Sequence, residues 1–420
     1  MKMKTICLLE NAVQEYAWGS YTAIAELLDE SSPSDVPQAE LWIGAHPKAP
    51  SRVRYDGKTV SLQKIIKDKP QNILGKTVAD KFNNKLPYLL KVLAAARPLS
   101  IQAHPNSAQA KEGFKRENEQ GIFINAPNRN YKDANHKPEC ICALTTFWAL
   151  NGFRKIIDII SFMEKICPQG LGNMLDELRN RPDSKGLKIF FKALMTLSQK
   201  EKIQVIDEAA NNAQKLEKKD PAFKWIIKLY KEYQEDIGVL SPAFLNLICL
   251  KPDQAMFLFA GELHSYLDGL GIELMANSDN VLRGGLTPKH VDVPELLKVV
   301  NFEERDIKIL QCEENSSNEC IYPSWAEEFI LSVISVDSKK NYTSPTVRSA
   351  EILLCTDGQA TITYFDNDKD ISLKKGKSVI VPASVRIYNI KGMAKIYKAS
   401  VNIAHSSQLI ADSPAESGIK

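Results

Sequence analysis

A helical block in the middle of the chain most constrains the fold. From about residue 154 to residue 238, apolar residues recur at the three- and four-residue spacing of amphipathic helices, with lysines and acidic residues between them. Short apolar runs separated by turn residues, which are typical of β-strands, lie on both sides of this block. The 420 residues are several times a typical domain of roughly 150 residues, so more than one core is expected. We therefore predict a mainly β protein with an α-helical insertion.

The strand pattern outside the block predicts two β domains. The predicted boundaries are 1–153 and 239–321 for a discontinuous first domain, 154–238 for the helical insertion domain, and 322–420 for a C-terminal β domain. In the last of these, apolar runs such as 352–355 alternate with turn residues, as in the antiparallel strands of a β-sandwich. Its single histidine, His405, does not make a conventional metal centre, so we expect no metal there.

Charge and hydropathy exclude several classes of protein. Lys and Arg number 54 against 51 Asp and Glu, a balance unlike that of proteins that mainly coat nucleic acid or anionic membranes. No run approaches the roughly 20 apolar residues that span a bilayer, and Glu10 interrupts the apolar stretch that a signal peptide needs. The eight scattered cysteines indicate reduced thiols, and Cys140 and Cys142 fit buried packing better than metal binding. We expect a cytoplasmic monomer that binds neither nucleic acid nor membrane.

Four residues have the chemistry of a metal site. Gln102 and His104 are two apart in a predicted strand, so both side chains point to the same face. Glu139 ends the string NHKPE, and His264 follows the helical block. Two imidazoles, a carboxylate and an amide oxygen suit zinc, which keeps an exchangeable position in a catalytic site. Taken singly, each histidine also fits an ordinary hydrogen-bonded residue.

A second cluster, DNVLRGGLTPKH at residues 279–290, places Arg283 among flexible residues. The planar guanidinium can pair with a phosphate or with an enediolate oxygen, and the adjacent glycines allow a substrate to approach closely. The alternative is a tight turn between strands with an exposed arginine. Spacing alone leaves both interpretations open.

Several strings occur in order along the chain. They are YAWGS at 16–20, AELWIGAHP at 39–47, LPYLLKVLAAARPLSIQAHPN, NYKDANHKPE and HSYLDGLGIELMANSDNVLRGGLTPKHVDV. Together they closely resemble the motifs of the zinc-dependent type I mannose-6-phosphate isomerases, from about residue 14 to residue 297. Residues 322–399 resemble the second cupin domain of that family only in their pattern of apolar runs and turn residues. The resemblance implies two cupin, or jelly-roll, β-sandwich domains plus the helical domain.

The resemblance also implies a reaction and its residues. It implies one zinc ion per chain and the interconversion of mannose 6-phosphate and fructose 6-phosphate through a zinc-stabilised cis-enediol, so the partner is a small sugar phosphate. Arg283 matches the catalytic arginine of the family, and His136 is expected to make an outer hydrogen bond rather than to bind the metal. The implied zinc ligands are Gln102, His104, Glu139 and His264.

An aldose–ketose isomerase also needs a base that moves a proton between carbons 1 and 2. Glu273 lies nine residues after His264, and Lys137 lies two residues before Glu139. The sequence does not choose between these two candidates, because burial beside a metal could make either group a base. Several donors and positive charges could hold the phosphate without joining the carbon chemistry. The candidates for that role are Lys91, Ser100 and Lys289.

Two other classes of function compete. A cupin oxygenase would hold ferrous iron with two histidines and a carboxylate. Gln102, the basic residues and the ordered motifs argue against it, and oxygen uptake with iron would identify it. A non-catalytic sugar-phosphate sensor would bind substrate without turnover, although the chain retains the implied ligands, Arg283 and both candidate bases.

Overall fold

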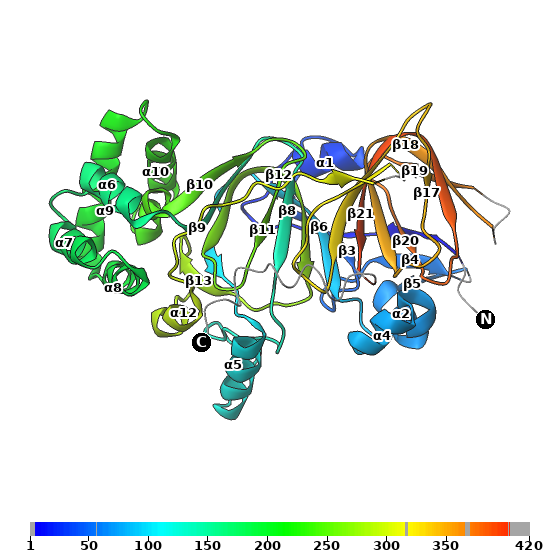
Figure 1. Cartoon of the computed structure of the whole chain (residues 1–420), viewed down its shortest axis with the longest axis horizontal. Helices are drawn as coiled ribbons and strands as arrows, with labels where there is room; N and C mark the ends of the chain where they lie inside the picture. Colours follow the sequence, from blue (N-terminus) through cyan, green and yellow to red (C-terminus); the bar gives the residue numbers. More distant parts are fainter. Residues whose placement is uncertain (1–4, 56, 316–317, 366–369, 402, 404–420) are drawn as a thin grey trace.

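A computed structural model describes residues 5–55, 57–315, 318–365, 370–401 and 403. Figure 1 shows an elongated molecule in which a group of helices, a central β region and a second β region follow one another along the long axis. Among the described residues, no helix combines the length and apolar character needed to cross a membrane. His405 lies outside the described residues, so the expectation of a metal-free C-terminal domain stays a prediction.

The central region is a ten-stranded sheet built around one long strand, β12 (His264–Ala276). Its other strands are β2 (Ala12–Gln14), β3 (Glu40–Gly44), β6 (Tyr88–Ala95), β7 (Ile101–Ala103), β8 (Glu139–Ala143), β9 (Phe147–Phe153), β10 (Leu245–Leu250), β11 (Ala255–Leu258) and β13 (Leu282–Gly285). The first residues of β12 pair with β7 and β9, and the later ones pair with β6 and β8. Two halves of the sheet therefore meet along β12.

An irregularity in β12 affects which residues share a face. His264 and Glu273 are nine positions apart, so in a regular strand they would face opposite sides. The register with β9 shifts between Tyr266 and Asp268, where β12 has one extra residue. An extra residue in a strand moves the side chains that follow it to the opposite face. This shift allows both His264 and Glu273 to face the interior of the central region.

The second sheet takes strands from both ends of the chain. Among the described residues it has eleven strands: β1 (Cys7–Glu10), β4 (Arg52–Tyr55), β5 (Lys58–Ser61), β14 (Glu313–Glu314), β15 (Glu319–Ile321), β16 (Ile330–Val336), β17 (Tyr342–Thr343), β18 (Glu351–Tyr364), β19 (Ile371–Lys374), β20 (Ser378–Val381) and β21 (Tyr388–Ser400). β1 pairs with β20 and β4, and β15 pairs with β16. Strand pairing therefore crosses the boundaries expected from the sequence, and the division into domains stays a prediction.

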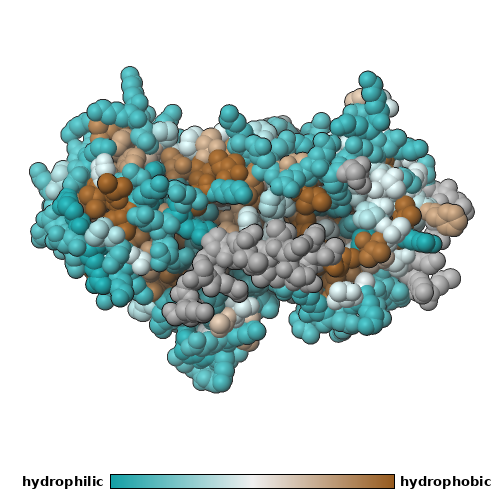
Figure 2. All heavy atoms as spheres, in the orientation of Figure 1, coloured by the Kyte–Doolittle hydropathy of each residue, from teal (hydrophilic) through white to brown (hydrophobic). Residues whose placement is uncertain are grey.

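The helical insertion forms where its periodicity predicts it. Its helices are α6 (Ile156–Ile166), α7 (Gly172–Asn180), α8 (Ser184–Met195), α9 (Gln199–Leu216) and α10 (Pro221–Glu232). Met163 of α6 and Leu194 of α8 belong to the same buried cluster as Phe153 of β9, so the helices share a core with the central sheet. On the face drawn in Figure 2, hydrophilic residues with apolar patches between them cover this end of the molecule.

Shorter helices lie outside the insertion. They are α1 (Ala23–Leu28), α2 (Leu62–Asp68), α3 (Pro70–Leu74), α4 (Lys76–Lys81), α5 (Ser107–Glu119), α11 (Ser241–Phe244), α12 (Val293–Val299) and the 3₁₀ helix η1 (Ile237–Leu240). α5 begins where Asn106 accepts a hydrogen bond from the N–H of Gln109 and the Gln109 side chain accepts one from the N–H of Asn106. This capping box fixes the start of α5 directly after the β7 segment.

One pair of cysteines differs from the expectation. Cys312 and Cys320 form a disulfide, with Cα atoms 5.1 Å apart, so the prediction that the thiols are reduced is wrong for this pair. The antiparallel pairing of β14 with β15 brings the two residues together. These strands are only two and three residues long, and segments this short carry no clear alternation of apolar residues. Cys140 and Cys142 are free and buried, as expected.

Candidate active site

Three of the predicted metal ligands converge in the interior of the central region. His104, Glu139 and His264 are at most 2% exposed, and one donor atom from each lies within 4.8 Å of the others. His104 Nε2 is 3.3 Å from Glu139 Oε1, and His264 Nε2 is 3.5 Å from Glu139 Oε2. In the part of the chain that the structure describes, no other three His, Cys, Asp or Glu residues meet in this way.

Two atoms of this group lack the hydrogen bonds that buried polar atoms require. His264 Nε2 and Glu139 Oε2 are buried and make no hydrogen bond to any described residue. The other nitrogen of each ring is engaged, because His104 Nδ1 lies 2.7 Å from the carbonyl oxygen of Asn280 and His264 Nδ1 lies 2.9 Å from that of Glu262. Each Nδ1–H donates, which leaves the Nε2 lone pairs facing the group. These residues therefore fit a metal ion.

The charge states also suit a metal. Burial lowers the pKa of His104 to about 4, with a further contribution from the Lys137 charge, so the imidazole is neutral near pH 7. Burial raises the pKa of Glu139, but Lys137 and His104 together hold it well below the ordinary carboxyl value. Neutral imidazole and ionised carboxylate are the forms that bind metal ions.

Gln102 and Arg283 face the same side as His264. Gln102 on β7 stands directly opposite His264 on β12 and directly opposite Arg283 on β13. Residues directly opposite one another on antiparallel strands point to the same face. The three side chains therefore form a row across neighbouring strands. Burial lowers the pKa of Arg283, and its guanidinium stays charged at neutral pH. The ligand role of Gln102 and the catalytic role of Arg283 remain predictions.

A second charged group lies along the neighbouring strands. Lys91 on β6 and Ile141 on β8 both stand opposite Glu273 on β12, and Glu139 is two residues from Ile141, so Glu139 and Glu273 share a face. Lys91 Nζ is 2.9 Å from Glu273 Oε2 and 3.6 Å from Glu40 Oε1. Burial raises the pKa of Glu273, and the charges of Glu139 and Glu40 add to this rise against the opposing effect of Lys91.

The second candidate base, Lys137, lies directly at the predicted ligands. Its Nζ is 2.9 Å from Glu139 Oε1 and 3.5 Å from His104 Nε2. Both candidate bases therefore lie near Glu139. Lys137 forms an ion pair with it, and Glu273 points to the same face of the sheet from β12.

The three candidate phosphate residues lie in different settings. Lys91 is buried in the ion pairs with Glu273 and Glu40, Ser100 is half-buried just before β7, and Lys289 is exposed in the segment after β13. Their phosphate roles remain predictions.

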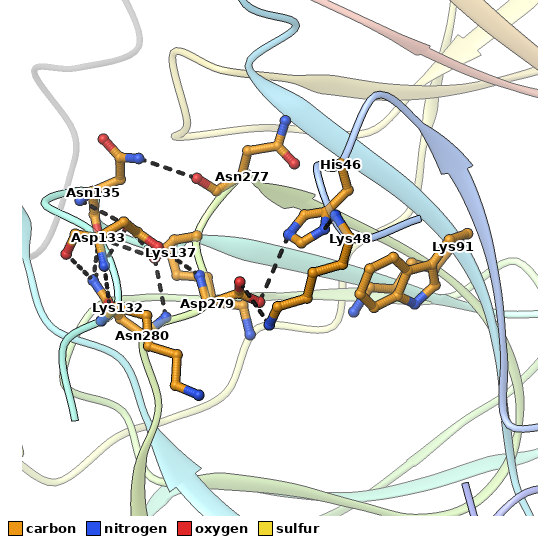
Figure 3. Close-up of polar contacts among 12 residues, drawn as sticks. His46, Lys48, Lys91, Lys132, Asp133, Asn135, Lys137, Asn277, Asp279 and Asn280 are labelled. Carbon is orange, nitrogen blue, oxygen red and sulfur yellow. Dashed lines mark hydrogen bonds and ion pairs between the residues drawn. The ribbon is translucent and has the colours of Figure 1, made fainter. Parts of the chain in front are cut away.

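Two further lysines, Lys48 and Lys132, lie near Arg283 and Lys289, and reasoning from the sequence missed them. Lys48 Nζ lies 2.9 Å from Asp279 Oδ2, as Figure 3 shows. Burial lowers the pKa of Lys132, and the charges of Lys48, Arg283 and Lys289 lower it further against the opposing effect of Asp279, so these four cations lie near one another. Both residues lie inside strings quoted above for the resemblance, or directly beside them, which is the signal that could have identified them.

His136 does not contact the predicted ligands. Its Nε2 lies 2.6 Å from Glu328 Oε1, in the segment before β16, so it joins the central region to the second sheet. The expected outer hydrogen bond in support of a metal ligand is not made among the described residues, because the His136 ring bonds Glu328 at the second sheet instead.

We expect the His136–Glu328 pair to stabilise the fold more in acid than in alkali. Burial and the charge of Lys111 lower the pKa of His136. The hydrogen bond to Glu328 and the charges of Glu328 and Glu327 outweigh them, so the pKa is raised above 6.5. Such a histidine stabilises the fold below its unfolded pKa, and this contribution is lost as the pH rises through the folded pKa. Urea unfolding of the wild type and of His136→Gln should differ more at about pH 5.5 than at about pH 8.5. Equal differences at both pH values would contradict this assignment.

Both the sequence and the fold of this chain are similar to those of known proteins. A family model described as phosphomannose isomerase type I, catalytic domain, matches residues 6–156, and one described as mannose-6-phosphate isomerase, cupin domain, matches residues 318–401. The mannose-6-phosphate isomerase of Escherichia coli is 41% identical over 396 residues, which cover 93% of this chain and 98% of that protein. The human mannose-6-phosphate isomerase is 34% identical, covering 90% and 93%.

Solved structures agree with these matches. A zinc-bound mannose 6-phosphate isomerase superposes with a TM-score of 0.87 at 38% identity, covering 95% of this chain and 100% of that chain. A histidine-to-alanine variant of the Salmonella typhimurium phosphomannose isomerase also gives 0.87, at 37% identity and the same coverage.

Proposed function

This chain belongs to the type I phosphomannose isomerase family, and from that premise we propose how its residues interconvert mannose 6-phosphate and fructose 6-phosphate. The enzyme is an aldose–ketose isomerase, an intramolecular oxidoreductase with a small sugar phosphate as substrate. The observation that carries the proposal is the buried group of His104, Glu139 and His264, in which two polar atoms make no hydrogen bond to any described residue.

We propose that Gln102, His104, Glu139 and His264 hold one zinc ion per chain. Nitrogen and oxygen donors are ligands that zinc accepts, and similar structures are described as zinc-bound. Bound zinc would supply Lewis-acid polarisation of the substrate oxygens. The two main-chain carbonyls that accept from the Nδ1 atoms keep His104 and His264 in the orientation that this binding requires.

Glu273 is the proposed base. Its burial and its raised pKa bring a carboxylate closer to the neutral range in which a general base works best. It would take the proton from carbon 2 of the aldose and return it to carbon 1 by way of a cis-enediol, while the hydroxyl proton of oxygen 2 passes to oxygen 1. Lys91 holds the carboxylate in place through the 2.9 Å ion pair. Lys137 is already engaged with the Glu139 carboxylate, so we assign it to ordering the site.

Arg283 is proposed to stabilise negative charge on the substrate oxygens as the enediol forms. The guanidinium fork offers two parallel donors to neighbouring oxygens, and in a partly buried site such preorganised charge is worth more than in water. Its place opposite Gln102, in the row with His264, supports this role.

Incubation of the purified protein with mannose 6-phosphate in deuterated water tests the proposal. NMR should show fructose 6-phosphate, with solvent deuterium entering at carbon 1 or carbon 2, because a base that exchanges with solvent carries the proton. Binding without conversion would identify a sugar-phosphate sensor instead, and oxygen consumption on adding ferrous iron would identify an oxygenase.

Replacing Lys289 with alanine is expected to raise KM for mannose 6-phosphate about 10-fold and to leave kcat unchanged, because a charge-assisted hydrogen bond to the phosphate acts equally in ground and transition states. The kinetics of unphosphorylated mannose provide the control, since that sugar lacks the group that Lys289 would hold. A fall in kcat with unchanged KM would remove Lys289 from the phosphate site.

We also propose, from the sequence, that the enzyme works in the cytoplasm as a monomer. Analytical ultracentrifugation of the purified protein tests the oligomeric state, and a mass twice that of one chain would contradict it.

A further inference from the structure

Asn280 is a fully buried amide at the junction of two loops of the site, with an exposed fraction of 0%. Its Oδ1 accepts hydrogen bonds from the main-chain N–H groups of Lys132 and Asp133, at 2.6 and 3.1 Å. Its Nδ2 donates to the carbonyl oxygens of Asp133 and Asn135, both at 2.9 Å. Figure 3 shows this side chain against the loop. The amide therefore uses its full donor and acceptor capacity on one turn of chain, residues 132–135.

The main chain of Asn280 reaches the proposed metal ligands. Its carbonyl oxygen accepts the hydrogen bond from His104 Nδ1 at 2.7 Å. Three residues later, Arg283 stands opposite Gln102. Asn280 thus connects three parts of the site. They are the 132–135 loop, the proposed ligand His104, and strand β13 with Arg283.

A second set of bonds locks the two loops to each other. Asp133 Oδ1 accepts from Ser278 Oγ at 2.9 Å, and Asp133 Oδ2 accepts from the N–H of Asp279 at 2.8 Å. Within the second loop, Asn280 N–H donates to the same Ser278 Oγ at 3.2 Å. Since each loop provides side chains that bond the main chain of the other, the position of the Asn280 carbonyl depends on the loop that the Asn280 side chain holds.

We propose that Asn280 is a positioning residue that orients His104 through its carbonyl oxygen and holds the 132–135 loop against the site. The inference rests on the proposed function, because it takes His104 as a metal ligand. Partners that fix the second nitrogen of a ligating histidine set its ring orientation, and changing them typically costs about 10- to 100-fold in metal affinity or activity. If the hydrogen bonds of Asn280 only stabilised the fold, their loss would leave metal affinity and activity unchanged in protein that still folds.

The experiment compares Asn280→Ala and Asn280→Asp with the matched control Asn277→Ala. Asn277 lies in the same segment and also bonds main-chain carbonyls through Nδ2, those of Leu86 and Tyr88, but it has no bond to His104. Zinc affinity is measured by competition with a chromophoric chelator, and the visible spectrum of the cobalt-substituted protein reports ligand geometry. Both readouts are independent of turnover. Mannose 6-phosphate kinetics provide kcat and KM.

We expect Asn280→Ala to weaken zinc binding by about 10-fold or more, to alter the cobalt spectrum and to lower kcat, whereas Asn277→Ala lowers only the melting temperature. Asn280→Asp keeps the Oδ1 acceptor and loses both Nδ2 donors. If the alanine variant does not fold, the same measurements on the aspartate variant decide whether Asn280 positions His104. Wild-type zinc affinity, spectrum and kcat in folded Asn280 variants would overturn the inference. An inactive wild type that binds zinc would instead refute the proposed function, while the affinity and spectral comparison would still decide the role of Asn280.

Discussion

Glutamine in place of Glu273 is expected to lower kcat by about 100- to 10,000-fold, the range that general acid–base catalysis contributes. Glutamine keeps the shape of the side chain and an oxygen that can accept from Lys91, but it cannot take a proton from carbon. Steady-state kinetics with mannose 6-phosphate give the measurement. Zinc content should be unchanged, because Glu273 is not a proposed ligand.

Glu40→Gln is the matched control, since Glu40 also faces Lys91, at 3.6 Å, and has no proposed role in proton transfer. The raised pKa of Glu273 adds a second readout. The acid limb of the wild-type kcat/KM profile should lie above the ordinary glutamate value of about 4.3 and should vanish in Glu273→Gln. Undiminished turnover in Glu273→Gln, together with a zinc-loaded but inactive Lys137→Met, would make Lys137 the base.

Removing the guanidinium in Arg283→Ala should lower kcat roughly 100-fold or more, with zinc content and fold retained, as is typical when a preorganised charge is deleted. The reason is that the proposed contact strengthens as charge develops on the substrate, so its loss falls on the chemical step rather than on binding. Arg283→Lys should also be poor, because a point charge does not reproduce the two parallel donors of the fork.

Kinetics and metal analysis of the same Arg283 preparations check this assignment. A variant with wild-type kcat and a raised KM would place Arg283 at the phosphate instead. Lys132 and Lys289 lie near Arg283, and they are the residues with which such a phosphate contact would be shared.

The parts of the fold that were predictable depend on local patterns. The helical insertion follows from amphipathic periodicity. Gln102 and His104 share a face because strands have a period of two. Spacing does not show which strands pair, and β8 and β12 are far from β7 in sequence. Only the resemblance to the family motifs therefore implied that Gln102 and His104 lie near Glu139 and His264.

The parts that were missed depend on tertiary pairing. An alternating pattern shows which face of a strand is buried but not its partner, so the pairing of β1 with β20 was not anticipated. The Cys312–Cys320 disulfide depends on a short hairpin, and the His136–Glu328 contact joins residues 192 positions apart. Asn280 looks like an ordinary loop amide in the sequence, and only the folded loops bury it and give its side chain five hydrogen bonds.

Turnover of metal-depleted protein, measured as zinc is restored in known amounts, tests the account most directly. Mannose 6-phosphate isomerisation should be absent from the depleted protein, should rise in proportion to bound zinc and should reach its limit at about one ion per chain, because a single group of ligands is proposed. Full activity in rigorously metal-free protein would contradict the account.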